Sequence, residues 1–249
     1  MPEVSASRYM TNAGWDDVPH LDERAKRELL DATPAYMRDA RSKGTPSLGA
    51  GAIYPFPESE ITVPPFAIPA YWPRCYGLDV GWNRTAAVWI ARDENNDTAY
   101  LYTEHYQSQA HPSVHASAIR ARGDWIPGVI DPAARGRQQR DGEQLLANYS
   151  ALGLNLFLAD NAINAGLWEC EQRFGTGRLK IFSTCANTIA EYRLYRRDER
   201  GNIVKKFDHA MDAMRYAALS GIPLARKAPL ILDRSQQRPS GPGDPLTGY

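Results

Sequence analysis

The sequence predicts an α/β fold in which a mixed β-sheet carries helices on both faces. Three β-rich runs follow one another between residues 75 and 106, and from residue 111 onwards short apolar runs alternate with stretches of helical periodicity. Runs joined by short turns pair antiparallel, whereas strands separated by a helix pair parallel. The sheet should therefore be antiparallel in its first part and parallel in its second part.

The ends of the chain differ from its centre. Residues 1–70 lack regular periodicity apart from one helix predicted over 20–37, and glycine and proline then recur up to Pro57. The tail carries five prolines and no periodicity, which is typical of disorder. We therefore expect an arm or linker over 1–70, a folded domain over 71–222 and a disordered tail over 223–249.

The elements of the central domain follow in order. The first three strands are predicted at 75–80, 85–91 and 98–106, with a turn at 93–97. The later elements are predicted as helix 111–122, a strand ending at Asp131, helix 142–152, strand 154–158, helix 163–174, strand 179–182, helix 188–194 and a last helix over 208–220. A charged segment, 195–206, precedes the last helix, for which Asp208 is the expected N-cap.

Composition restricts the function classes. Lys plus Arg and Asp plus Glu both number 29, so only local basic clusters could attract nucleic acid. The three cysteines are too widely spaced for a paired zinc site or a small disulfide scaffold, and no G-x-S-x-G motif supports Ser-His-Asp catalysis. No apolar stretch approaches the roughly 20 residues that cross a bilayer. These features favour an intracellular protein without a membrane partner.

Three distant carboxylates stand where an apolar element ends or turns polar, namely Asp79, Asp131 and Asp212. If the three elements meet, these acids form one cation site. Gly81 follows Asp79 closely and leaves the backbone open to a phosphate or a metal-bound ligand. The alternative reading is local, because an Asp before a Gly, or Asp131 before Pro132, is common in turns.

Asp208 and Asp212 share one face of the last helix, with His209 on the adjacent flank. Like charges at this spacing destabilise an isolated helix by about 0.2–0.5 kcal/mol, so a bound cation would account for them. Alternatively, Asp208 caps the helix and Asp212 pairs with Arg215 or a lysine. Oxygen ligands select hard cations such as Mg²⁺ or Mn²⁺, and two such ions about 3.5–4 Å apart can hydrolyse a phosphodiester.

Basic side chains that could bind the DNA backbone lie near these acids in the sequence. The candidates are Arg135, Arg137 and Arg140 after Asp131, and Arg196, Arg197, Lys205 and Lys206 before the last helix. Glu104 is expected to be exposed on an edge strand, and Asp160 and Glu191 are weaker candidates for the same cleft. His105 and His115 are expected to be surface or capping residues.

Three segments in this order resemble the C-terminal nuclease domain of the large terminase subunit of tailed bacteriophages: GLDVGWNRTAAVW, WIPGVIDPAARGR and YRRDERGNIVKKFDHAMDAMRYA. The resemblance covers roughly residues 70 to 221. It implies an RNase H-like fold and a metal-dependent endonuclease that cuts concatemeric viral DNA during genome packaging in the host cell cytoplasm. It also implies double-stranded DNA, the small terminase subunit and the portal protein as partners.

The resemblance assigns site residues position by position. Asp79 matches the metal ligand of the first strand, Asp131 the middle acid and Asp212 the acid of the last helix. Asp208 and His209 occupy the same family segment as further metal candidates. Two ions, Mg²⁺ or Mn²⁺, are the implied cofactors.

One departure from the family is large, because the 249 residues contain no G-x-x-x-x-G-K-[ST] phosphate loop. We therefore expect that this chain does not itself hydrolyse ATP, and that it is either an excised nuclease domain or a nuclease encoded separately from its motor. Two alternatives remain. The D-x-G pattern followed by Thr85 also resembles the phosphate-binding turn of actin-like and sugar-kinase phosphotransferases, and the chain could be a non-catalytic module of a packaging complex.

Overall fold

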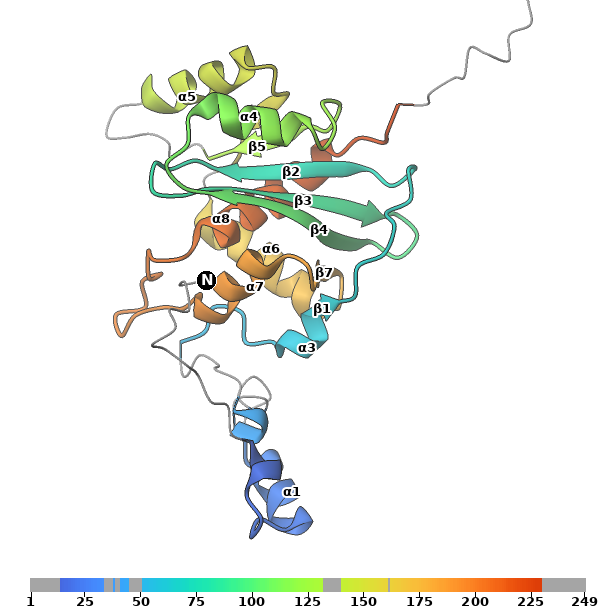
Figure 1. The fold of residues 1–249 in the computed structure, drawn as a ribbon, viewed down its shortest axis with the longest axis vertical. Coiled ribbons are helices and arrows are strands. Elements are labelled where there is room, and N and C mark those ends of the chain that lie inside the picture. Colours follow the sequence, from blue (N-terminus) through green and yellow to red (C-terminus); the bar gives the residue numbers. More distant parts are fainter. Residues whose placement is uncertain are drawn as a thin grey trace, which may run out of the picture.

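A computed structural model of the chain describes residues 14–33, 38, 41–44, 51–131, 140–160 and 162–229. Its centre is a seven-stranded sheet in the order β1-β7-β4-β3-β2-β5-β6 (Figure 1). The strands are β1 (Thr62–Val63), β2 (Arg74–Asp79), β3 (Thr85–Asp93), β4 (Thr98–Gln107), β5 (Gly128–Ile130), β6 (Leu156–Leu158) and β7 (Leu179–Phe182). The helices are α1 (Glu23–Asp31), α3 (Glu58–Ile61), α4 (Pro112–Arg120), α5 (Arg140–Ala151), α6 (Ile163–Gly175), α7 (Ala186–Leu194) and α8 (His209–Tyr216).

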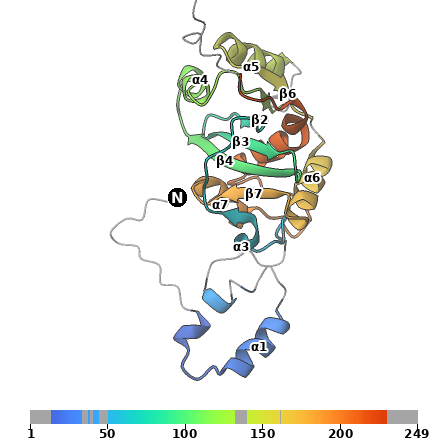
Figure 2. The ribbon, with the colours of Figure 1, turned by 90° about the vertical axis from the view of Figure 1, so that its right-hand side faces the viewer.

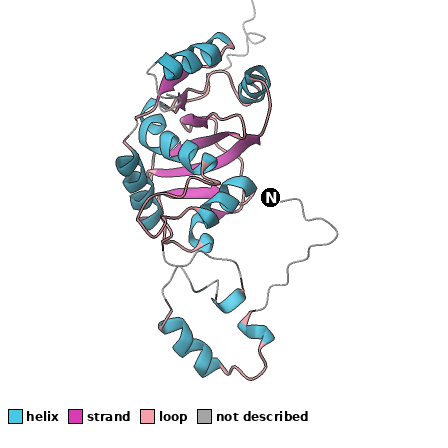
Figure 3. Ribbon diagram, turned by 90° about the vertical axis from the view of Figure 1, so that its left-hand side faces the viewer, coloured by secondary structure: helices cyan, strands magenta, loops and turns pink. Residues whose placement is uncertain are grey.

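The mixed sheet predicted from the sequence is confirmed. Strands β2, β3 and β4 pair antiparallel, whereas β5 pairs parallel with β2 and β6, and β7 pairs parallel with β4 and β1. Figure 1 shows α4 and α5 next to β5 and β2 at one end of the sheet, and α6, α7 and α8 next to β3, β4 and β7. Figures 2 and 3, each turned by 90° from Figure 1, show the strands between helices.

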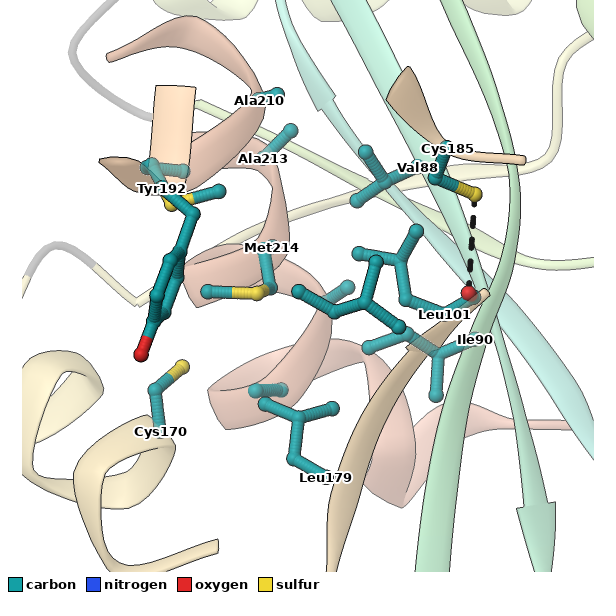
Figure 4. Packing of buried hydrophobic residues seen from close by; sticks show 14 of the residues in the cluster. Val88, Ile90, Leu101, Cys170, Leu179, Cys185, Tyr192, Ala210, Ala213 and Met214 are labelled. Atoms are coloured by element: carbon teal, nitrogen blue, oxygen red, sulfur yellow. Dashed lines mark hydrogen bonds between the residues drawn. The ribbon is translucent and has the colours of Figure 1, made fainter. Parts of the chain in front are cut away.

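Two hydrophobic cores follow from the alternation of side chains along the central strands. In β3, Ala86, Val88 and Ile90 belong to the core shared with α6, α7 and α8, whereas Ala87 and Trp89 belong to the core under α4 and α5. A period of two is expected for a strand that is covered on both faces. Figure 4 shows the first core, where Val88, Ile90 and Leu101 of the sheet meet Ala213 and Met214 of α8.

The same alternation decides where the end of β2 points. Cys75 lies in the core under α8, and Tyr76 and Leu78 lie in the opposite core. Gly77 and Asp79 therefore face α8. At Gly77 the helix lies so close that an added Cβ would be 1.9 Å from the carbonyl oxygen of Ala213. The glycine thus allows α8 to lie directly on the strand that ends in Asp79.

A β-bulge in β4 changes which side chains reach α7. Trp89 pairs with Thr103 and Ile90 with Leu101, so Tyr102 is an extra residue and the alternation shifts by one. Glu104 consequently points at α7. Its carboxylate accepts hydrogen bonds from the backbone N–H groups of the first turn, at Asn187 (2.9 Å) and Thr188 (2.8 Å).

The prediction for Glu104 was therefore wrong. Strand β4 lies between β3 and β7 and not at an edge. Besides the two backbone bonds, the carboxylate accepts hydrogen bonds from the side chains of Asn187 and Thr188. Glu104 is thus the N-terminal cap of α7 from a distant strand.

Residues 51–70 pack on the sheet and its core. Ile53, Tyr54 and Ile61 are buried in the core that α6, α7 and α8 cover, and β1 extends the sheet beside β7. We propose that the folded domain begins near residue 51 and not at 71. At the other end, α8 continues into a π-helical turn over Ala217–Gly221 and a short 3₁₀ turn over Ile222–Leu224. No helix in the described part of the chain is long and apolar enough to cross a bilayer.

The expected surface position of His105 and His115 was wrong. Both are buried, and a ring nitrogen of each lies 2.9 Å from a ring nitrogen of the other, so one ring donates a hydrogen bond to the other. The pair joins β4 to α4. Burial, together with the nearby charges of His115 and Arg122, lowers the pKa of His105 to about 4.

This histidine pair should make the protein less stable in mild acid. The pKa of His105 is about 4 in the folded protein and 6.5 in its ordinary state, so the unfolded chain binds more protons between these values. The contribution of His105 to the free energy of unfolding is at its full value above pH 6.5. It decreases by about 2–3 kcal/mol as the pH falls to 4. Urea unfolding of wild type and His105→Gln should show a weaker pH dependence in the variant, and equal dependence would contradict the prediction.

Candidate functional site

The end of β2 and the start of α8 meet in a direct side-chain contact. Nδ1 of His209 lies 2.7 Å from Oδ2 of Asp79. Asp79 reaches this position because Cys75, Gly77 and Asp79 share the face of β2 on which α8 packs. Two residues that are 130 positions apart in the chain thus share one hydrogen bond.

The environment of this pair raises the pKa of both side chains. Burial raises the pKa of Asp79 above its ordinary value, the hydrogen bond with His209 opposes the rise, and the charges of Asp212 and Asp131 add to it. The hydrogen bond to Asp79 raises the pKa of His209. Asp131 and Asp212 therefore lie near enough to Asp79 for their charges to act on it.

The side chain that caps α8 is Glu191, which lies on α7. Its carboxylate accepts hydrogen bonds from the backbone N–H groups of Ala210 (2.6 Å) and Met211 (3.3 Å), and a short one from the Tyr106 hydroxyl. Burial raises the pKa of Glu191. Glu191 therefore fixes the first turn of α8, and with it His209, without contacting the acids itself.

The expectation that the Asp208 side chain caps α8 was wrong. Asp208 occupies the N-cap position but makes no side-chain capping bond. Its φ of −122° and ψ of 3° differ from the extended backbone that usually turns a capping side chain towards the first N–H groups. The Asp208 carboxylate is consequently available for another partner.

That partner is a lysine shared with Asp212. Nζ of Lys205 lies 3.2 Å from Oδ2 of Asp208 and 3.0 Å from Oδ2 of Asp212. Burial disfavours the charge on Lys205, but the two carboxylates outweigh it and raise the pKa of the lysine. The acid pair of α8 therefore binds a cation in this structure, and the cation is an ammonium group.

Asp212 also pairs with Arg215 one turn further along α8. Its Oδ1 lies 3.1 Å from a terminal guanidinium nitrogen of Arg215, which is 2% exposed. Gly166 of α6 makes room for this arginine, because an added Cβ there would lie 2.5 Å from the Arg215 side chain. The alternative reading from the sequence, that Asp212 pairs with Arg215 or a lysine, thus describes the contacts of Asp212 correctly, although it does not exclude a metal role.

Asp131 follows β5 directly. Because β5 runs parallel to β2 with Leu78 beside Ile130, the next residues in register are Asp79 and Asp131. The backbone N–H of Asp131 donates to the carbonyl of Leu78 (3.2 Å). Burial, together with the nearby charge of Asp131, raises the pKa of Tyr216 of α8. The strand pairing therefore brings the middle acid beside the first one.

Among the described residues, no three His, Cys, Asp or Glu side chains are already arranged around one point that could hold a metal ion. The contacts above explain this, since His209 holds Asp79 while Lys205 and Arg215 hold Asp212. The chemistry of the donors nevertheless fits a hard cation, because carboxylates stand at the ends of β2 and β5, next to each other in register, and on α8, which packs on β2.

Gly81 does not leave the β2–β3 turn open in the way that the sequence suggested. An added Cβ at Gly81 would lie 2.9 Å from the carbonyl oxygen of Arg84, so the turn itself fills that side. The Thr85 hydroxyl donates to the Gly81 carbonyl (3.1 Å). Asp160, another weaker candidate, is exposed and accepts a hydrogen bond from the backbone N–H of Ala162, as a turn residue does.

The predicted DNA-binding residues divide into two sets. Arg196, Arg197, Lys205 and Lys206 are exposed on the segment that enters α8. Arg197 forms an isolated bridge with Ile203, which folds this segment back towards the site. Arg135 and Arg137 lie outside the described residues, and of Arg140 only the backbone, at the start of α5, is described.

Comparison with known proteins agrees with this architecture. The family described as "Terminase RNaseH-like domain" matches residues 76–220. The large terminase subunits of Salmonella phage P22 and Enterobacteria phage LP7 are both 31% identical over 222 residues, which are 85% of this chain. The aligned region covers 44% of the P22 protein and 46% of the LP7 protein, so the chain spans less than half of their length.

Solved structures similar to this chain are also those of large terminases. The nuclease domain of the P22 large terminase is 30% identical, has a TM-score of 0.67, and covers 72% of this chain and 96% of its own length. A large terminase from a thermophilic bacteriophage, solved in complex with ADP, shares the fold with a TM-score of 0.60 at 20% identity. It covers 84% of this chain and 54% of its own length.

Proposed function

Because the chain belongs to the terminase RNaseH-like domain family, which confirms the RNase H-like fold expected from the sequence, we propose that it is a metal-dependent DNA endonuclease. Its substrate is concatemeric viral DNA, cut during genome packaging in the host cell cytoplasm. Two observations support the proposal: the parallel pairing of β2 and β5 makes Asp79 and Asp131 the next residues in register, and His209 of α8 hydrogen-bonds Asp79. The small terminase subunit and the portal protein are the proposed partners.

Asp79, Asp131 and Asp212 are the proposed metal ligands, and Asp208 is a further candidate ligand. Two bound Mg²⁺ or Mn²⁺ ions would supply an activated water and stabilise the leaving oxygen of the phosphodiester. His209 orients the Asp79 carboxylate through their 2.7 Å hydrogen bond. Glu191 fixes the helix start on which His209 and Asp212 depend. The basic residues of 195–206, with Arg135, Arg137 and Arg140, would bind the DNA backbone.

The experiment that tests the proposal is metal removal. Supercoiled plasmid should be nicked and linearised by the purified chain with Mn²⁺ or Mg²⁺, and cleavage should disappear with EDTA and return when Mn²⁺ is added in excess. Failure to cleave under any of these conditions, by a protein that is folded by circular dichroism, would refute the nuclease activity. Zn²⁺ serves as the control cation, because it prefers nitrogen and sulfur ligands.

Lys205 should compete with the metal for the α8 acids. Its ammonium group contacts both Asp208 and Asp212, so a metal ion must displace it. Lys205→Ala is expected to bind Mn²⁺ about 3- to 10-fold more tightly, because removing the competing charge leaves the carboxylates free to receive the ion. Isothermal titration with Mn²⁺ in the absence of DNA measures this. Arg200→Ala, at the tip of the same segment, is the control, and equal affinity in wild type and Lys205→Ala would contradict the prediction.

A further inference from the structure

Two large aromatic side chains are exposed beside the proposed site. Trp82 is 68% exposed and lies three residues after Asp79, and Phe207 is 46% exposed and lies two residues before His209. Three residues span at most about 11 Å, and the 2.7 Å contact of Asp79 with His209 ties the two segments together. The β2–β3 turn and the entry to α8 lie at the same end of the sheet (Figure 1). The two aromatic residues therefore lie on the rim of the site.

Trp82 is held in place although its side chain is exposed. Its carbonyl oxygen accepts a hydrogen bond from the backbone N–H of Gln109 (3.0 Å), which follows β4. The Thr85 hydroxyl bridges the same turn by donating to Gly81. The indole thus projects from a fixed turn, which reduces the conformational entropy that a binding partner must remove.

Phe207 has an unfavourable backbone conformation. Its φ is +58°, in the left-handed region where glycine and asparagine are common and a bulky residue is rare. Burial does not explain the choice of phenylalanine, because almost half of the side chain is exposed. A strained aromatic residue directly before Asp208 points to a contact with a ligand.

Positive charges lie on both segments that carry these aromatic residues. The guanidinium group of Arg84, two residues after Trp82, lies 4.7 Å from the centre of the Tyr106 ring. The ammonium group of Lys206 lies 5.3 Å from the centre of the Phe207 ring. Aromatic faces alternating with cations are the surface that single-stranded nucleic acid requires, with bases stacked on the rings and phosphates near the charges.

We propose that Trp82 and Phe207 stack on unpaired bases of the DNA strand that passes the acids. The proposal deepens the nuclease function and rests on it for the identity of the ligand as DNA. In a closed duplex each base is stacked between its neighbours and offers no free face to a side chain. The site would therefore take DNA whose strands are opened at the point of cleavage.

Binding measured without metal ions tests this proposal independently of cleavage. With EDTA present, oligo(dT) of about 12 nucleotides and a duplex of the same length are titrated by fluorescence anisotropy. Trp82→Ala and Phe207→Gly are each expected to weaken single-strand binding about 10-fold and duplex binding less than about twofold. Trp168→Ala is the matched control, because Trp168 is 60% exposed on α6 and should leave both affinities unchanged.

Two further measurements separate stacking from a structural role. Oligo(dT) should quench tryptophan fluorescence in Trp168→Phe but much less in Trp82→Phe. Phe207→Gly should melt no lower than wild type, since glycine adopts a positive φ without strain, and Phe207→Tyr should retain single-strand binding.

Unchanged single-strand affinity in both alanine and glycine variants would overturn the proposal. Equal losses for single strand and duplex would also overturn it, because they would indicate backbone contacts alone. If the binding results hold but the wild type does not cut plasmid with Mn²⁺, the proposed function fails and the stacking site stands. If the wild type cuts but the variants bind normally, the nuclease function stands and the stacking proposal fails.

Discussion

Asp79→Asn should cleave plasmid DNA at least about 100-fold more slowly than wild type with Mn²⁺, while melting at nearly the same temperature. Asparagine has the same shape and can still accept the hydrogen bond from His209, but it lacks the negative charge that a metal ligand supplies. Even residues that only orient metal ligands typically cost 10- to 100-fold, so loss of a ligand should cost more. Asp131→Asn should show a comparable loss.

Asp212→Asn should lose both cleavage and stability. Arg215 is 2% exposed and forms an ion pair with Asp212. Its other terminal nitrogen has no hydrogen-bond partner among the described residues. Breaking a buried pair leaves an uncompensated charge, which typically costs about 3–5 kcal/mol. Thermal unfolding should therefore distinguish Asp212→Asn from Asp79→Asn, although both fail in the cleavage assay.

Asp208→Asn separates the role of Asp208, directly before α8, from that of Asp212 on the helix. Both contact Lys205, but only Asp212 lies on the helix itself, and we expect Asp208→Asn to lose about 10-fold or less in cleavage. Asp160→Asn, in an exposed turn, is the control and should cleave as wild type does. Full activity in Asp79→Asn, Asp131→Asn or Asp212→Asn would contradict the assigned site.

Much of the fold could be predicted because it depends on local patterns. The β-rich runs at 75–80 and 85–91 predicted β2 and β3 closely, and β7 was predicted at 179–182 as observed. Strand β1 has only two residues, Thr62 and Val63, which is too short for a periodic pattern. It exists because β7 offers a free edge, and that edge is formed only after the sheet is assembled.

The helix caps could not be predicted because they come from distant elements. Glu104 caps a helix that begins 82 residues later in the chain, and Glu191 caps one across a charged excursion. Neither lies at the usual capping position, where sequence reasoning places Asp208. The β-bulge at Tyr102 has no local signal either, yet it turns Glu104 towards α7.

The metal site shows the same division between local and tertiary information. The sequence predicted Asp79, Asp131 and Asp212 as one site because each acid stands where an apolar run ends or turns polar, and such transitions mark the ends of elements. The sequence offered a pairing of Asp212 with Arg215 or a lysine as one of two alternatives, but it could not show that Asp212 contacts both, since the Lys205 contact depends on how 195–206 folds back. The metal ligands themselves stay a prediction.

Gly77→Ala should destabilise the protein by more than about 3 kcal/mol and abolish cleavage. Overpacking a core with extra methyl groups costs about 1–3 kcal/mol when neighbouring side chains can move. Here the new Cβ would lie 1.9 Å from the carbonyl oxygen of Ala213 and 3.0 Å from the backbone nitrogen of Ala217, so the helix backbone itself must shift. Such a shift moves α8 off β2.

The loss of cleavage follows from where α8 lies. Asp212 and His209 are on this helix and Asp79 is on the strand, so moving α8 off β2 separates the acids and lengthens the bond between Asp79 and His209. Thermal unfolding and plasmid cleavage should therefore fail together in Gly77→Ala. Gly175→Ala, at the end of α6, is the matched control, because its Cβ would meet only the Phe56 ring at 3.3 Å. A Gly77→Ala protein that melts and cuts like wild type would show that α8 does not need to lie on β2 to form the site.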